Sequence, residues 1–113
     1  MGSLSLEGRT FRVVRNDGDT PETSEGTLVR FSQTGNLVEA AWSGGLVRIA
    51  RLVGVLEGAR IRHAYVVVND RDEVRSGQGT IEVEVRDGGK LRLVESWDWT
   101  DPPGRGLCTM EEV

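Results

Sequence analysis

The stretch K-L-R-L-V-E-S-W-D-W, from Lys90 to Trp99, alternates apolar and polar residues and indicates the fold of the chain. Successive side chains of a β-strand point to opposite faces, so alternate residues share one face. One face of this stretch consists of Leu91, Leu93, Glu95, Trp97 and Trp99. The other face is polar, apart from one valine. The pattern predicts a strand whose aromatic face is turned toward a protein interior.

Similar alternation, interrupted by glycine-rich turns, runs through the rest of the 113 residues. Gly44-Gly45 and Asp87-Gly88-Gly89 predict tight turns, because glycine adopts the backbone angles that hairpins require. Gly77 and Gly79 predict a bend or bulge in the longest strand. The predicted strands cover residues 9–14, 26–32, 37–43, 46–54, 60–69, 74–86, 90–99 and 107–112, and the predicted loops cover residues 16–24 and 102–104.

About eight short strands with tight turns are typical of an antiparallel meander. A meander of this size is best stabilised by closing on itself, because closure removes the unpaired edges. We therefore expect an all-β fold, a single small antiparallel β-barrel over residues 1–113 with a flexible segment over residues 1–8. A two-sheet sandwich is the alternative. Such a barrel is just wide enough to be filled by side chains or to hold one small ligand.

The composition argues against several classes of function. A formal net charge of −4 disfavours nucleic acids and anionic membrane surfaces as partners. The chain shows neither a long apolar span nor a signal peptide, so a cytoplasmic location is expected. One His and one Cys cannot supply the four ligands of a structural zinc site, so no metal or cofactor is expected. Cys108 is expected to be inert and to form no disulfide within the chain.

Strand parity also predicts which side chains point into the barrel. In residues 46–54, Arg51 shares a face with Val47, Ile49 and Val53. In residues 60–69, His63 and Tyr65 share a face with Ile61 and Val67. Glu95 needs a partner among these groups, because burying an unpaired carboxylate costs several kcal/mol. Arg51 is the favoured partner, and His63 and Tyr65 are the alternatives.

The candidate binding residues are therefore Arg51, His63, Tyr65, Glu95, Trp97 and Trp99, together with Trp42 near a mouth of the barrel. Three interpretations remain open. The polar residues can form a structural network within an ordinary aromatic core. They can instead anchor a ligand in an aromatic-lined pocket. They can also act as acid and base in catalysis.

Several segments resemble a family of small bacterial proteins that carry the label N-acetylglutamate synthase. The similarity includes W-S-G-G-L-V-R-I-A-R-L-V-G (42–54), A-Y-V-V-V-N (64–69), G-K-L-R-L-V-E-S-W-D-W-T (89–100), and Gly106, Glu111 and Glu112. The resemblance implies a calycin-like or avidin-like small barrel and carries over no catalytic residue. An acetyltransferase that uses acetyl-CoA normally has a phosphate-cradling loop before a helix, and this sequence shows neither.

Three functions follow as hypotheses. The first is a barrel that binds a small molecule in an aromatic-lined interior. The second is a cofactor-independent isomerase, cyclase or lyase, with Glu95 or His63 as acid or base and Arg51 holding an anionic group. The third is a homodimerising interaction module with a filled interior. Cavity volume separates them: a void of roughly a few hundred Å³ would favour the first two, and a dry, packed interior would favour the third.

Overall fold

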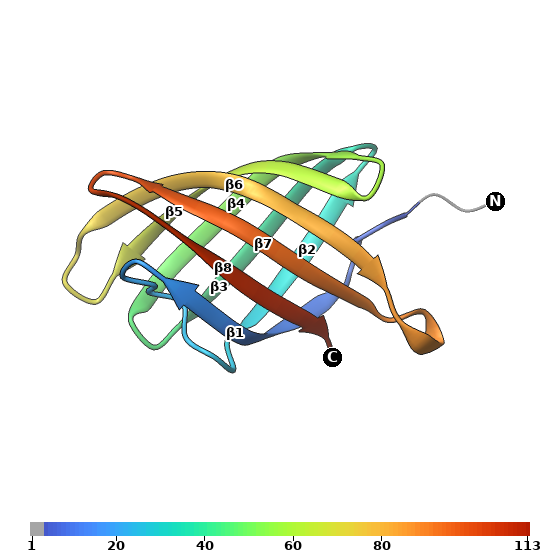
Figure 1. The fold of residues 1–113 in the computed structure, drawn as a ribbon, viewed down its shortest axis with the longest axis horizontal. Helices are drawn as coiled ribbons and strands as arrows, with labels where there is room; N and C mark the ends of the chain where they lie inside the picture. The colour runs from blue at the N-terminus through green and yellow to red at the C-terminus, as the bar shows by residue number, and fades with distance from the viewer. Residues whose placement is uncertain (1–3) are drawn as a thin grey trace.

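The computed structural model describes residues 4–113 and shows eight strands that pair in chain order, with the last strand returning to the first (Figure 1). All eight pairings are antiparallel, and the β1–β8 pairing closes the barrel. The fold class is confirmed, and the sandwich is excluded. The strands are β1 (Thr10–Gly18), β2 (Leu28–Thr34), β3 (Leu37–Gly44), β4 (Val47–Glu57), β5 (Arg60–Asn69), β6 (Val74–Val85), β7 (Leu91–Thr100) and β8 (Pro103–Glu112).

The alternation of β7 sorts its side chains as the sequence predicts. The buried residues are Leu91, Leu93, Glu95, Trp97 and Trp99. Its pairings with β6 and β8 continue without a register shift, so the two-residue period is preserved along the whole strand. The 3₁₀ turn Asp87–Gly89 precedes β7, at the predicted position. Because β7 is regular, its inward face is fixed by sequence alone.

Two predicted loops prove to be partly strand. Residues Asn16 to Gly18 extend β1 and pair with Cys108, Leu107 and Gly106 of β8. Pro103 begins β8 and pairs with Thr100, so the last turn is shorter than expected. The polar and proline-rich composition of these segments predicts loops. The ladder that closes the barrel overrides that local preference by supplying backbone partners.

Gly77 and Gly79 do not mark a bulge, because β6 pairs with both neighbours in unbroken register. They instead allow close approach of other groups. A Cβ atom on Gly77 would lie 2.3 Å from the hydroxyl of Tyr65, and one on Gly79 would lie 2.0 Å from the carbonyl oxygen of Ser96. Contacts this short are forbidden, so both positions require glycine.

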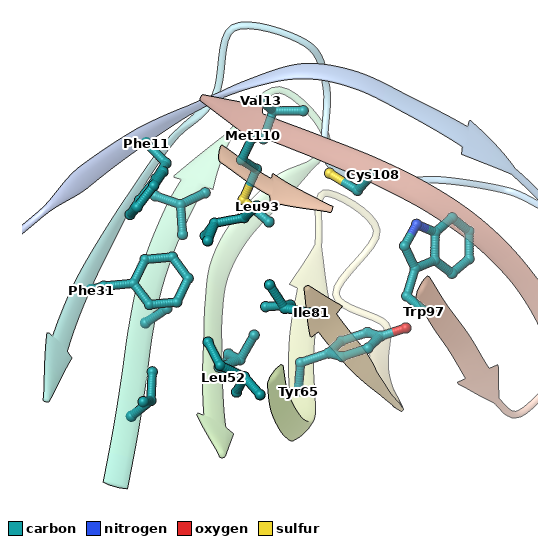
Figure 2. Close-up of a cluster of buried hydrophobic side chains, with 14 of the residues drawn as sticks. Phe11, Val13, Phe31, Leu52, Tyr65, Ile81, Leu93, Trp97, Cys108 and Met110 are labelled. Atoms are coloured by element: carbon teal, nitrogen blue, oxygen red, sulfur yellow. The ribbon is translucent and has the colours of Figure 1, made fainter. Parts of the chain in front are cut away.

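The two ends of the barrel differ. Connections after β1, β3, β5 and β7 gather at one end, which we call the mouth, and those after β2, β4 and β6 at the other (Figure 1). Near the far end, Leu6 is fully buried and donates its backbone N–H to the Gln33 side chain at 2.9 Å. The Phe11 and Phe31 rings pack edge to face there, 5.3 Å apart (Figure 2).

The flexible segment predicted over residues 1–8 falls partly outside the described residues, which begin at Leu4. Leu6 belongs to the hydrophobic core, and Leu4 packs against it. Within residues 4–113, no helix is long and apolar enough to cross a membrane.

Candidate ligand-binding site

An interior cavity of about 40 Å³ lies toward the mouth of the barrel. Each ordered water needs roughly 10–15 Å³ on this measure, so the cavity has room for about three. Its lining is mostly apolar and aromatic, with a few polar groups. The lining residues are Val13, Asn16, Pro21, Glu22, Thr23, Val29, Phe31, Trp42, Leu52, Tyr65, Val67, Glu95, Trp97, Trp99, Cys108 and Met110.

Five aromatic residues line this cavity, and we call four of them, Trp42, Tyr65, Trp97 and Trp99, the aromatic cage; the fifth is Phe31. The Tyr65 and Trp99 rings are 5.4 Å apart and the Trp97 and Trp99 rings are 5.8 Å apart, both edge to face. Figure 2 shows Trp97, Tyr65 and Cys108 at one side of the buried cluster, away from Phe11 and Phe31. The predicted inward orientation of Tyr65, Trp97 and Trp99 is confirmed by their burial.

Glu95 also points inward, as parity predicts, and is only 9% exposed. Its Oε2 lies 2.9 Å from Nε2 of His63, whose side chain is fully buried. Despite this short distance, neither ring nitrogen of His63 makes a hydrogen bond with the described residues. His63 is absent from the cavity lining. Glu95 therefore faces the cavity, and His63 stands behind it.

Arg51 is not the partner of Glu95. The register of β4 shifts between Val47 and Ile49, and this irregularity exchanges the two faces of the strand that follows. Ala50 and Leu52 are buried, whereas Ile49, Arg51 and Val53 are exposed. Arg51 therefore lies on the outer wall, where its guanidinium donates to the carbonyl oxygen of Ala50 at 2.8 Å. The inward orientation predicted for Arg51 is wrong.

The connection between β1 and β2, residues 19–27, contributes to the cavity wall and is called the mouth loop. All three tryptophans donate hydrogen bonds to the mouth loop or to β1, the strand before it. Trp42 donates its indole N–H to Oγ1 of Thr23 at 3.0 Å, and Trp99 donates to the carbonyl oxygen of Thr20 at 3.2 Å. Trp97 donates to Oδ1 of Asn16 at 2.8 Å. The aromatic cage and the mouth loop are thus one connected unit.

A buried polar cluster anchors the mouth loop to β5 and β6. Oε2 of Glu22 accepts hydrogen bonds from Asn69 at 3.1 Å and from Arg75 at 3.0 Å. The other carboxylate oxygen of Glu22 is buried without a partner among the described residues. The Arg75 guanidinium lies over the Trp99 ring, 3.9 Å from its centroid. Sequence reasoning missed this cluster, because Glu22 stands in a polar stretch that predicts only a solvated loop.

Cys108 and Tyr65 also line the cavity and remain protonated near neutral pH. Burial, followed by the negative charge of Glu95, raises the pKa of both side chains. Tyr65 donates its hydroxyl to the carbonyl oxygen of Asp98 at 3.1 Å. Cys108 is a free, buried thiol, and its raised pKa opposes formation of the reactive thiolate.

Among residues 4–113, no group of three or more His, Cys, Asp or Glu side chains could hold a metal ion. The cavity thus offers carboxylates, indole rings and apolar surface. Glu95 lines the cavity and lies next to the His63 imidazole. Any acid–base chemistry in this site would therefore involve Glu95.

The fold and the cavity define a class: a small up-and-down β-barrel with an aromatic-lined interior site at one mouth. A family model described as avidin-like protein matches residues 4–113, and the chain belongs to this family. The match agrees with the avidin-like barrel that the sequence resemblance implies. No curated protein and no solved structure matches the chain significantly.

Proposed function

We propose that the protein binds a small molecule inside the barrel, between the aromatic cage and Glu95. The observation that carries this proposal is a largely buried carboxylate that faces an aromatic cavity and has the imidazole of His63, and no Lys or Arg of the described residues, beside it. Such a group opposes folding, whereas a ligand that donates a hydrogen bond to it gains affinity and orientation. Membership of the avidin-like family supports the same conclusion.

The small volume of the cavity limits the size of the ligand. Its volume of about 40 Å³ is well below the roughly 300–1,000 Å³ of sites for drug-sized ligands. A ligand of more than a few heavy atoms therefore requires the mouth loop to move. Hydrogen bonds from Trp42, Trp99, Asn69 and Arg75 hold residues 20–23 of this loop over the cavity. These bonds lie outside the backbone ladders between the strands.

A ligand screen on the folded protein tests the proposal. Tryptophan emission and melting temperature report binding, because three tryptophans line the cavity and a ligand of the folded state raises its stability. A true ligand should lose affinity in the Glu95→Gln variant. It should keep its affinity in Arg51→Ala, since Arg51 lies on the outer wall. Equal effects of the two substitutions would place the ligand outside the barrel.

A second copy of the chain is a further proposed partner. Ile49, Val53 and Val66 are 46%, 57% and 46% exposed on the paired strands β4 and β5. Exposed apolar side chains gathered on one face favour a protein interface. We propose that this outer wall forms a homodimer. Sedimentation should then show a dimer that Val53→Glu dissociates, and a wild-type monomer at all concentrations would refute the proposal.

A further inference from the structure

We propose that the ligand of the interior cavity carries a positively charged nitrogen that binds Glu95 within the aromatic cage. This inference rests on the proposed function and adds the chemical class of the ligand. It is carried by three observations, namely the charges of the cavity lining, the pairing of each carboxylate, and the arrangement of the aromatic rings.

The lining of the cavity is negatively charged. Glu22 and Glu95 belong to it, and no Lys or Arg among the described residues does. Tyr65 and Cys108 stay neutral, because burial and Glu95 hold their pKa values well above the usual range. An anionic ligand would face two carboxylates without a cationic partner in the lining. A cationic ligand meets complementary charge.

The two carboxylates differ in how they are compensated. Glu22 forms an ion pair with Arg75, with 3.0 Å between Nη1 and Oε2. Glu95 has no Lys or Arg partner within the described residues, and its contact with His63 is not a hydrogen bond. His63 supplies a compensating charge only when it is protonated. A ligand nitrogen with N–H donors would bring Glu95 both a positive charge and a hydrogen bond.

The aromatic cage suits the same kind of ligand. Cations bind to the faces of tryptophan and tyrosine rings through the ring quadrupole. The chain already uses this interaction once, since the Arg75 guanidinium carbon lies 3.9 Å from the centroid of the Trp99 ring. A neutral ligand with N–H groups would satisfy the hydrogen bonding of Glu95 but not its charge. The carboxylate and the rings together therefore favour an ammonium or amidinium group.

Three matched probes test the inference on the wild-type protein: benzylammonium, benzyl alcohol and benzoate. They share a ring and differ in the charge of the polar group. Calorimetry and tryptophan emission at neutral pH should show benzylammonium binding at least about tenfold more tightly than benzyl alcohol, because charge-assisted hydrogen bonds are stronger than neutral ones. Benzoate should bind weakest.

Binding of benzyl alcohol or benzoate as tight as that of benzylammonium overturns the cation inference and leaves small-molecule binding intact. Failure of all three probes also overturns it, and the ligand screen described above then decides the proposed function separately.

Two isosteric variants test whether the charge of Glu95 is the one that binds the ligand. Glu95→Gln should weaken benzylammonium at least about tenfold and leave benzyl alcohol unchanged, since the amide keeps an acceptor oxygen. Glu39→Gln removes the same charge from the exposed side of β3 and should change neither affinity. Unaltered benzylammonium binding by folded Glu95→Gln overturns the inference. If that variant does not fold, the wild-type comparison of the three probes still decides.

Discussion

Gly106 contributes to the site through the side chain that it lacks. A Cβ atom at this position would lie 2.2 Å from the Trp97 ring and 2.3 Å from the carbonyl oxygen of Asp17. Gly77 of β6 makes similar room for Tyr65, its register partner on β5. Trp97 and Tyr65, two rings of the aromatic cage, thus each depend on a glycine that faces them, in the way that large and small residues alternate in a packed core.

We expect Gly106→Ala to destabilise the protein by about 1–3 kcal/mol, the usual range for an overpacked interior. The carbonyl of Asp17 belongs to the backbone and cannot rotate away, so β1 or the Trp97 ring must shift. Urea unfolding measures the loss, and tryptophan emission should change with it. Ser96→Ala, on the exposed face of β7, is the control and should stay within about 0.5 kcal/mol of wild type. Equal stability of the two variants would contradict the packing argument.

At the scale of elements, Asn69 at the end of β5 joins the β5–β6 turn to the mouth loop. Its amide group donates to Glu22 and to Glu73, at 3.1 and 2.8 Å. Its side-chain oxygen, Oδ1, accepts the backbone N–H groups of Arg71 and Glu73, both at 3.0 Å. Asn69 is 1% exposed, so none of these bonds is readily replaced by water. One side chain therefore fixes both connections at this part of the mouth.

Asn69→Ala should lower stability by about 2–4 kcal/mol, because it removes four hydrogen bonds, one of them to the buried Glu22. Hydrogen bonds from Asn69, then Arg71, lower the pKa of Glu73. This stabilisation is present above the carboxyl's ordinary pKa of about 4.3 and is lost as the pH falls through the lowered value. An NMR titration of the variant should show the Glu73 pKa moving back up. Asn36→Ala, in the exposed β2–β3 turn, should leave both properties unchanged.

The strands β7 and β4 show what could and could not be predicted from sequence. Parity placed Glu95 correctly because β7 pairs without interruption. Parity failed for Arg51 because the irregularity near Arg48 in β4 has no residue signature, and both faces of that stretch are half apolar. The Glu22 cluster was beyond sequence reasoning, since its partners are 47 and 53 residues away. Regular geometry follows from local pattern, whereas buried polar contacts depend on the closed barrel.

At the scale of the whole molecule, the barrel is not joined equally all the way round. β1 and β2 share three register pairs, Thr10 to Arg12 with Leu28 to Arg30. β1 and β8 share seven, and β4 and β5 share ten. Beyond Arg12, the gap between β1 and β2 is bridged by the mouth loop, with Val13 hydrogen-bonded to Gly26 and Thr27. The β1–β2 pairing, which we call the β1–β2 seam, therefore has the fewest backbone hydrogen bonds to break when the barrel opens.

Hydrogen exchange should follow this asymmetry. Amides of the mouth loop and of the β1–β2 seam should exchange fastest among the barrel's hydrogen-bonded amides, because short ladders open at low free energy. The pairings of β5 with β4 and with β6, which have ten and nine register pairs, should exchange slowest and serve as the internal reference. A ligand held by Glu95 should slow exchange at residues 19–27, since those residues close the cavity that it occupies. Protection of the mouth loop equal to that of β5 and β6 without ligand would show a rigid mouth. Such a mouth would admit only ligands that fit the cavity of about 40 Å³.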